Sequence, residues 1–487
     1  MKQILVVLAL MMSSQFVTAA TNVFVCYWGT WSYYRSGEGK FSVDQIDPNM
    51  CTHLVYAFAK LDNGVITASD PYLDLQDNSG LGMYSKFNDL KLVNPNLKTL
   101  IAIGGWNEGS LKYSTMASTP QSRKKFVDSV VAFLGKHGFD GLDVDWEYPA
   151  NRGGAPQDKD NFVLLLSELR ASLDSKNHLL TAAVSAGQAT IDTAYDVPGL
   201  SKYLHLINIM SYDFFGSWNP YTGHNAPFRA RQGAPETEKM LNVESSVEYW
   251  IAKGADPGKL TLGLPMYGRT FTLANPANDG FGAPTTGPGP AGPITNEAGS
   301  LGYNEICTML GSGGWKITRD PDVVGPVAVK DKLWIGFDDV NSLKAKVNFA
   351  KSVGLGGVMV WSIETDDFNG KCHGTKNPLL NAIRSAMTGK QVTVKPTATT
   401  KPSPVRTTKL TPTATTQCVT IKVRTTSKSP SSPTELECPA EGFYPDPQDK
   451  TKFYRCIVTA SGGLEAVSFD CPVGTVFNAE YNVCTFP

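Results

Sequence analysis

Residues 139–149 alternate acidic and apolar side chains, a pattern that favours a β-strand over any other element. Side chains two positions apart on a strand point to the same face, so Asp143, Asp145 and Glu147 are expected to stand in a row, neighbours about 6–7 Å apart. The apolar residues between them then fill the opposite face. A solvated edge strand with its acids in water is the alternative, but its second face would not be this apolar. The strand is therefore predicted to be buried, with three carboxylates facing one site.

The three carboxylates also constrain the chemistry of that site. Ionised together they repel one another, and in a partly desolvated site at least one should hold a proton well above the usual carboxylate pKa of about 4. A carboxyl group that stays protonated near neutral pH can act as a general acid. Clustered carboxylates with mutually perturbed pKa values mark functional sites more often than scaffolding. Asp140 is set apart from them, because Asp before Gly is a common turn pair, and its predicted role is structural.

The same segment carries a family resemblance. Asp140-Gly-Leu-Asp143-Val-Asp145-Trp-Glu147 matches the DGxDxDxE signature of the family 18 glycoside hydrolases, which comprise chitinases and their inactive lectin relatives. The chain resembles the secreted, animal-type chitinases of that family. The resemblance implies an enzyme that cleaves β-1,4 links between N-acetylglucosamine units of chitin with retention, by substrate assistance through an oxazolinium ion.

Two other functions stay open. The first is a non-catalytic, chitin-binding lectin on the same barrel; such relatives lose the acid at the Glu147 position, which this chain keeps. The second is a structural or mucin-associated protein dominated by its C-terminal part. Chitin and chito-oligosaccharides are the expected partners of a monomer. No cofactor or metal is expected, because the six histidines are scattered without ligand spacing and neither a phosphate-cradling glycine loop nor a nucleotide motif occurs.

The resemblance implies roles for individual residues. Glu147 would protonate the leaving oxygen and later deprotonate the attacking water, Asp145 would bind the substrate's N-acetyl group, and Asp143 would share a proton with Asp145. Tyr212 resembles the family's donor to the acetamido carbonyl. The implied substrate-binding residues are Trp31, Trp106, Met210, Asp213, Trp218, Tyr267, Arg269, Glu297 and Trp361. Tryptophan rings suit the C–H faces of sugars, although each could instead anchor a loop, and the charged residues could form ordinary salt bridges.

The rest of the sequence indicates an α/β fold. From residue 22 to about 388, short apolar runs alternate with helix-like segments, as in repeated βα units. Strands are predicted at residues 23–28, 53–60, 99–104, 141–147, 180–186, 206–212, 260–265 and 357–361. Amphipathic helices are predicted at 123–137, 161–174, 243–253 and 342–353. Eight strands close a (β/α)8 TIM barrel, assigned to residues 21–387, with its active site at the C-terminal strand ends.

Aromatic and acidic residues stand at those predicted strand ends: Trp28, Trp31, Trp106, Glu147, Tyr212, Asp213, Tyr267 and Trp361. The connection between the seventh and eighth strands, about 267–340, is far too long for one helix. It contains Pro/Gly-rich runs and further strand-like pieces. We therefore expect an inserted α+β lobe there that forms one wall of a groove.

Length and charge limit the remaining possibilities. A chain of 487 residues has room for one barrel and an appendage. The net charge of −1 becomes −10 once Lys2 and the eight basic residues of 388–434 are set aside, which suits a neutral polysaccharide better than nucleic acid. Residues 1–20 read as a secretory signal peptide, and no later segment has eighteen consecutive apolar residues, so a secreted, extracellular protein without a membrane span is expected.

The C-terminal part predicts a linker and a small module. Residues 388–434 are a Thr/Pro/Lys-rich stretch that cannot bury a core, either O-glycosylated or a plain flexible tether. Residues 435–487 are predicted to be a β-rich, disulfide-stapled module, since a unit this short needs covalent links. Its sequence resembles the peritrophin-A type of chitin-binding module. The candidate chitin-binding residues of this module are Tyr444, Phe453, Tyr454 and Phe486, the last in place of the family's Trp.

Nine cysteines are consistent with disulfides in a secreted chain, with one left over. For the barrel, the resemblance implies bridges Cys26–Cys51 and Cys307–Cys372. For the module it implies Cys438–Cys456 and Cys471–Cys484, because the family's second cysteine is replaced, at Lys450, and its sixth is absent. Cys418 then lies alone in the linker.

Overall fold

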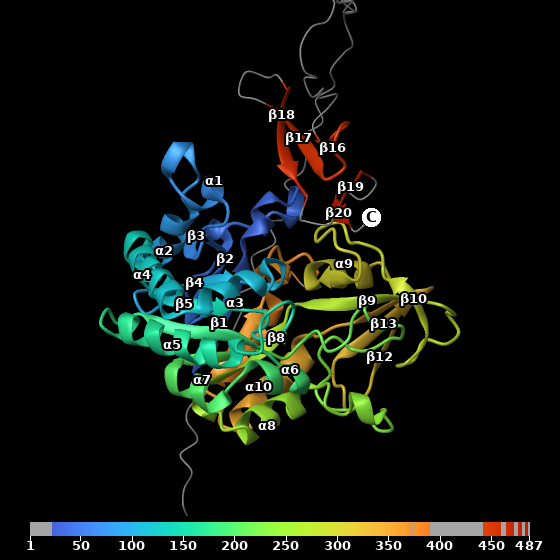
Figure 1. Ribbon diagram of the computed structural model, residues 1–487. Helices are drawn as coiled ribbons and strands as arrows, with labels where there is room; N and C mark the ends of the chain where they lie inside the picture. The colour runs from blue at the N-terminus through green and yellow to red at the C-terminus, as the bar shows by residue number, and fades with distance from the viewer. Residues whose placement is uncertain are drawn as a thin grey trace, which may run out of the picture. The chain divides into compact units, whose positions relative to one another are not determined.

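Eight parallel strands close into a barrel in the computed structural model, which describes residues 22–372, 374–389, 442–458, 464–471, 476–479 and 483–485 (Figure 1). Around the barrel the strands follow the order β1, β2, β4, β5, β6, β7, β8 and β15, and β15 pairs with β1 to complete the ring. Their bounds are β1 Val23–Gly29, β2 His53–Asp62, β4 Lys98–Gly104, β5 Gly141–Asp145, β6 Leu179–Ser185, β7 Leu206–Met210, β8 Leu260–Pro265 and β15 Gly357–Trp361. The predicted barrel is confirmed.

Helices surround this barrel. They are α1 Pro71–Asp74, α2 Met83–Val93, α3 Leu111–Ala117, α4 Pro120–His137, α5 Asp158–Asp174, α6 Gln188–Ala194, α7 Val197–Tyr203, α8 Val243–Ala252, α10 Val340–Ser352 and α11 Pro378–Thr388. The four predicted helices correspond to α4, α5, α8 and α10, with ends within three residues of the predicted ones. A short antiparallel strand, β3 (Val65–Ala68), extends β2 beyond the ring.

The helix ends follow from local sequence, as α4 illustrates. Thr119 is the N-cap and accepts a hydrogen bond from the Ser122 backbone N–H, while Pro120 occupies the first turn, where no N–H is needed. Gly138 ends the helix at a φ of 78°, a left-handed conformation that glycine adopts without strain. The chain is then free to enter β5 three residues later. The end of α4 thus fixes where the chain enters β5, the strand that carries the carboxylates.

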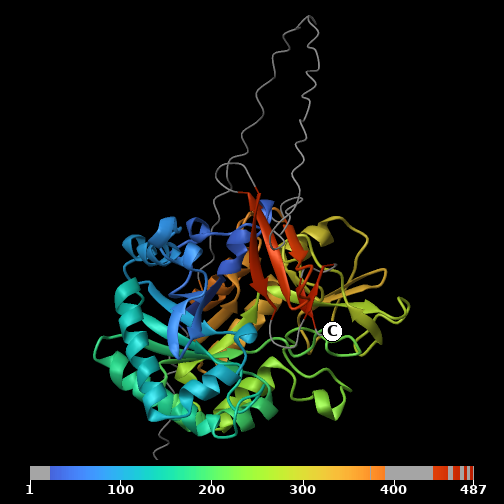
Figure 2. The same cartoon turned by 45° about the horizontal axis from the view of Figure 1, so that its top comes forward.

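The inserted lobe is confirmed between β8 and β15. Its main sheet runs β10 (Thr285–Pro288), β9 (Tyr267–Leu273), β14 (Leu333–Gly336), β13 (Pro326–Lys330), β12 (Lys316–Arg319), all antiparallel, and β11 (Ser300–Gly302) also pairs with β9. Helix α9 (Tyr303–Gly311) completes it. Figures 1 and 2 both place the lobe beside the barrel, on the side opposite α4. The lobe therefore widens one side of the barrel.

Two disulfides in this part of the chain match the predicted pairs. Cys26 is joined to Cys51, and Cys307 to Cys372. The first ties β1 to the segment before β2, and the second ties α9 of the lobe to the segment after β15. The lobe is thus covalently fixed to the barrel's last strand connection.

The described residues fall into two units, the second within 398–487. In it, β16 (Gly442–Pro445), β17 (Lys452–Val458) and β18 (Leu464–Asp470) form an antiparallel sheet, and β19 (Val476–Asn478) pairs with β20 (Val483–Thr485). Cys456 and Cys471 each take part in a disulfide, as predicted, and their predicted partners Cys438 and Cys484 lie outside the described side chains. The sheet agrees with the β-rich module expected from the sequence.

Several expectations lie outside the described residues. These are the signal peptide of residues 1–20, the linker from 390 onward with Cys418, and the side chains of Cys438, Cys484 and Phe486. Among the helices of the described ranges, none has the length and apolarity needed to span a bilayer.

Candidate active site

Strand β5 carries the carboxylates into the barrel interior, between β4 and β6. Asp143 is fully buried and Asp145 nearly so, which excludes the solvated edge strand. The adjacent end of β4 fits Asp145 closely, since the Gly105 N–H donates to the Asp145 carbonyl at 2.8 Å. A Cβ at Gly104, whose φ is 119°, would lie 2.0 Å from that same oxygen. Glycine is therefore required beside Asp145.

Asp143 is held by a belt of polar side chains that crosses the barrel. Its Oδ1 accepts hydrogen bonds from the Thr181 hydroxyl and from Asn208 Nδ2, and its Oδ2 accepts one from the Tyr27 hydroxyl at 2.7 Å. Asn208 in turn accepts a bond from the Thr261 hydroxyl at 2.6 Å. Five strands contribute one residue each. Burial raises the pKa of Asp143, and its three donors oppose that rise by stabilising the anion.

Asp145 has the opposite surroundings. Burial, the charge of Glu147 and the charge of Asp143 all raise its pKa well above the ordinary value. Its buried Oδ1 has no hydrogen-bond partner among the described residues. A buried carboxyl oxygen without a partner is costly, so this atom is poised to accept a group that enters the site.

Glu147 lies two residues beyond the last residue of β5, so the predicted strand 141–147 was two residues too long. Its side chain is still buried, at 8% exposure. Burial raises the pKa of Glu147 to about 7, while a hydrogen bond with Tyr148 and the charge of Arg152 lower it. Near neutral pH this carboxyl group therefore exists in both protonation states, as a group that donates and then accepts a proton must.

Aromatic rings surround the end of β15. The ring of Trp361 lies 5.6 Å from that of Tyr27, 5.8 Å from Phe58 and 6.0 Å from Trp31, centroid to centroid. Trp31 is 45% exposed, so the cluster opens to solvent at the mouth of the barrel. Trp28, also at a predicted strand end, differs: it is fully buried and donates to Ser32, and thus belongs to the core.

A second group lies where β7 and the lobe meet. Arg269 donates two hydrogen bonds to the Asp213 carboxylate, at 2.7 and 2.8 Å, and the Tyr267 hydroxyl donates a third at 2.7 Å. Glu297 lies 3.8 Å from Arg269, and the exposed ring of Trp218 lies 5.1 Å from its guanidinium. The sequence had left two roles open for the charged residues, substrate contact and salt bridging. In the structure Arg269 pairs with both Asp213 and Glu297.

Tyr212 connects the second group to β15, and Met210 lies close to it in the chain. Tyr212 is 9% exposed, its ring packs against Tyr267 at 6.1 Å, and its hydroxyl points toward the sulfur of Met359 at 3.7 Å. Met210 ends β7 and is partly buried. Burial raises the pKa of Tyr212, as do the neighbouring Tyr267 and Asp145. Tyr212 therefore keeps its proton and remains a donor.

Sequence reasoning missed five participants: Tyr27, Thr181, Asn208, Thr261 and Phe58. Three of them bind Asp143, yet each comes from a different strand, so no local pattern connects them. One signal was present. Asn208 is a polar residue in the otherwise apolar strand β7, and an amide inside a buried strand needs partners.

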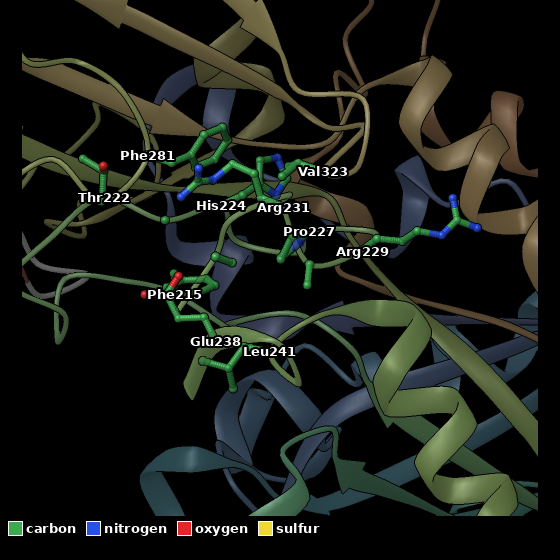
Figure 3. Close-up of a pocket in the computed structure, with 14 residues that line it drawn as sticks. Phe215, Thr222, His224, Pro227, Arg229, Arg231, Glu238, Leu241, Phe281 and Val323 are labelled. Carbon is green, nitrogen blue, oxygen red and sulfur yellow. The ribbon is translucent and has the colours of Figure 1, made fainter. Parts of the chain in front are cut away.

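Two other features of the described residues are weaker candidates for a functional site. One group of Cys, Asp, Glu or His side chains in the described ranges has metal-like spacing, Cys307, Asp367 and Cys372, but its two sulfurs form a disulfide. A separate cavity of about 30 Å³ lies between the 215–241 segment and the lobe, beside His224, Arg231 and Phe281 (Figure 3). That volume holds roughly two water molecules, too few for a sugar.

In the second unit, the candidate aromatics are partly packed. Tyr444 stacks on Tyr454 at 5.7 Å and Phe453 on Phe477 at 4.6 Å. Tyr454 is buried, whereas Tyr444 and Phe453 are partly exposed. Of the three candidate aromatics that the structure describes, Tyr444 and Phe453 thus have exposed surface.

A comparison with protein families matches residues 23–366 to the glycosyl hydrolases of family 18. The chain belongs to that family. It is thus a glycoside hydrolase. Separately, residues 438–487 match the chitin binding Peritrophin-A domain.

Curated and solved relatives agree. This chain is 38% identical to mouse chitotriosidase-1, and the match covers 95% of each of the two chains. It is 45% identical to a Group IV chitinase of Ostrinia furnacalis solved in complex with allosamidin, with a TM-score of 0.74 over 76% of this chain and 99% of the other. Human YKL-39, described as a pseudo-chitinase with retained chitooligosaccharide binding, is 41% identical with a TM-score of 0.70, over 75% and 100% of the two chains. The family thus contains both enzymes and binders.

Proposed function

We propose that this protein is a secreted chitinase that hydrolyses β-1,4 links between N-acetylglucosamine units with retention, using the substrate's own acetamido group as nucleophile. The carboxylates on and after β5 carry the proposal. Asp143 has three donors, Asp145 has an unpartnered buried oxygen, and the pKa of Glu147 is about 7. These are three different electrostatic states in one row. Different states suit different roles.

Glu147 is the proposed general acid. In its protonated form it gives its proton to the oxygen of the leaving sugar as the bond from that oxygen to the anomeric carbon breaks. The acetamido carbonyl oxygen forms the new bond to the anomeric carbon, which produces a cyclic oxazolinium ion. Glu147, now ionised, then takes a proton from water as the water oxygen attacks the same carbon and opens the ring. Two displacements leave the product in the β configuration.

The other nearby acid does not suit the role of an enzymic nucleophile. Asp213 is the acid outside the row that contributes to the pKa of Glu147. Its carboxylate already binds Arg269 through two hydrogen bonds and Tyr267 through one. Forming a covalent bond to sugar would break these charge-assisted hydrogen bonds between Asp213 and Arg269, which are only partly exposed. A nucleophile supplied by the substrate avoids this cost.

Asp145 is proposed to receive the acetamido N–H. Its unpartnered Oδ1 is buried beside Glu147, and a hydrogen bond from the substrate amide would both satisfy that oxygen and stabilise the positive charge of the oxazolinium ion. Asp143 is proposed to share a proton with Asp145, because the charge of Asp143 raises the pKa of Asp145. Tyr212, which stays protonated, is the proposed donor to the acetamido carbonyl.

The aromatic residues are proposed to bind the sugar chain. Trp361 forms the floor under the reacting ring, and the exposed tryptophans Trp31, Trp106 and Trp218 provide stacking surfaces along the groove. Met210, Asp213, Tyr267, Arg269 and Glu297 are proposed to contact neighbouring sugars at the lobe. A paired Arg269 and Asp213 present a preformed polar surface, which lowers the entropy cost of recognition.

The domain plan follows the proposed function. We assign residues 1–20 to a secretory signal, 21–387 to the catalytic barrel, 388–434 to a linker and 435–487 to a chitin-binding module. The module would hold the enzyme at solid chitin and raise its local concentration there without adding a contact in the active site. Tyr444 and Phe453 are the module's candidate surface aromatics among the described residues.

A non-catalytic lectin is the second candidate, favoured by the likeness to a pseudo-chitinase. One experiment separates the two. Purified protein is given a soluble hexamer of N-acetylglucosamine, and the products and their first-formed anomer are followed by NMR. Cleavage with initial β-anomer supports retention by substrate assistance, and initial α-anomer would mean inversion with an opposed base. A hexamer that binds and stays intact would leave the lectin function.

A further inference from the structure

Arg152 connects two parts of the site that come from different strands. It lies in the turn after β5, is exposed, and has a φ of 51°. Its Nη1 donates a hydrogen bond to the backbone carbonyl of Glu147 at 3.0 Å. Its guanidinium carbon lies 3.5 Å from the centroid of the Trp106 ring, which follows β4. One side chain therefore contacts both the proposed acid's backbone and an aromatic platform.

The turn that carries Arg152 is braced from below. Asp158, which is fully buried, accepts hydrogen bonds from the backbone N–H groups of Ala150 and Ala155, at 3.3 and 2.8 Å, and from the Ser114 hydroxyl at 2.7 Å. The backbone on both sides of Arg152 is thus held to α3 and the start of α5. A residue on a braced turn can hold its contacts at a lower entropy cost than one on a free loop.

Stacking leaves Trp106 available for a ligand. A planar guanidinium over one face of an indole is a favourable cation–π contact. The Trp106 side chain is still 59% exposed, so its second face remains open to solvent. Without Arg152, little else among the described contacts would fix the plane of an indole this exposed.

We infer that Arg152 is a positioning residue of this glycosidase: it fixes the plane of Trp106 beside Glu147, so that the sugar whose oxygen Glu147 protonates stacks on a preset surface. It touches Trp106 and the Glu147 backbone, and acts on the substrate through them. The positive charge of Arg152 has a second effect: it lowers the pKa of Glu147. Burial and the charge of Asp213 act in the opposite direction and raise that pKa. The charge of Glu147 in turn raises the pKa of Asp145, and Tyr148 hydrogen-bonds to Glu147.

Two substitutions separate the effect of the stacked guanidinium plane from the effect of its charge. Arg152→Lys keeps the charge and loses the planar stack, whereas Arg152→Gln keeps a planar donor and loses the charge. With the hexamer as substrate, Arg152→Lys should raise KM about two- to fivefold with the alkaline limb of kcat/KM unmoved. Arg152→Gln should shift that limb upward by about half a pH unit, the effect expected of one exposed charge. Two variants with wild-type KM and pH profile would overturn the inference.

A double-mutant cycle tests whether Arg152 acts through Trp106. In the Trp106→Ala background, Arg152→Lys should no longer change KM, because the ring it orients is gone. An equal rise in KM with and without Trp106 would overturn the coupling. Arg229→Gln is the matched control, because Arg229 also stacks on an aromatic ring, that of Phe228, and pairs with Glu244. Its KM and pH profile should match the wild type.

This role rests on the proposed function, and a binding measurement keeps the two failures apart. In the full-length Glu147→Gln protein, hexamer binding is followed by tryptophan fluorescence with and without Arg152→Lys. Wild-type protein that fails to cleave the hexamer would refute the enzyme function alone. Binding that weakens two- to fivefold on adding Arg152→Lys still supports the positioning of Trp106, and unchanged binding would refute it.

Discussion

The Tyr27 hydroxyl on β1 donates a hydrogen bond of 2.7 Å to the Asp143 carboxylate on β5, across the interior of the barrel. The contact exists because the barrel closes, bringing inward side chains of opposite strands together. It is one of three donors that counter the effect of burial on the pKa of Asp143. The protonation of Asp143, and through it that of Asp145, therefore depends on a residue far away in the sequence.

Removing that donor tests the belt. Tyr27→Phe should raise the pKa of Asp143 further and lower kcat by about ten- to a hundredfold, because a hydrogen bond to a charged group is worth roughly 1.5–3 kcal/mol. Steady-state kinetics on the hexamer measure the effect. Tyr56→Phe is the control, since Tyr56 also donates to a buried carboxylate, Asp74, outside the row. It should cost stability with kcat unchanged; equal losses of kcat in both would argue against a specific role for Tyr27.

The pKa of Glu147 predicts a pH profile. A general acid works while protonated, and the pKa of Glu147 is raised to about 7 by burial. The value of kcat/KM should therefore fall by tenfold per pH unit above about pH 7, with the apparent pKa belonging to the coupled row rather than to one residue. Rates measured between pH 4 and 9 would check this. A profile flat through pH 8 would remove Glu147 from the role of acid.

The same burial predicts a gain in stability on substitution. Because the folded-state pKa of Glu147 lies above its ordinary 4.5, the native state holds the proton more tightly, and stability falls as pH rises from about 4.5 to 7. Glu147→Gln cannot ionise, so it should equal the wild type near pH 4 and exceed it by up to about 3 kcal/mol at pH 8. Turnover should be abolished while hexamer binding remains. Thermal unfolding at both pH values is the measurement, and a difference independent of pH would contradict it.

Much of this fold was predictable, because strand and helix periodicity are local properties of sequence. The eight barrel strands were predicted from short apolar runs and the acidic row on β5 from its alternation. Asp140 does have a structural role, because it accepts hydrogen bonds from the Thr99 N–H and from Lys91. What escaped depends on closure and on turn geometry. Thr181 and Asn208 became partners of Asp143 only once β6 and β7 stood beside β5. No periodicity could place Arg152 over Trp106, since the two residues follow different strands.

Gly104 is expected to be indispensable for the position of Asp145. Gly104→Ala would bring a Cβ within 2.0 Å of the Asp145 carbonyl at a φ of 119°, so the end of β4 must move. We expect a loss of at least about 2 kcal/mol in unfolding free energy together with most of the activity. Gly135→Ala is the matched control, because it lies within α4 with open space around it. Alanine there should stabilise by up to about 1 kcal/mol; similar effects of the two changes would contradict the close fit at Asp145.

Deleting the residues after Thr388 separates hydrolysis from attachment. The barrel and the C-terminal residues fall into different units, and the barrel's last helix, α11, ends at Thr388, so the shortened chain should fold and cleave the soluble hexamer at the wild-type rate. On solid chitin, loss of the module should lower the bound fraction in a sedimentation assay, because the tether no longer raises the local enzyme concentration. Tyr444→Ala in the full-length protein refines the test, since this partly exposed ring should contribute to attachment without affecting hexamer cleavage. Undiminished chitin binding by the shortened chain would assign attachment to the barrel's exposed tryptophans.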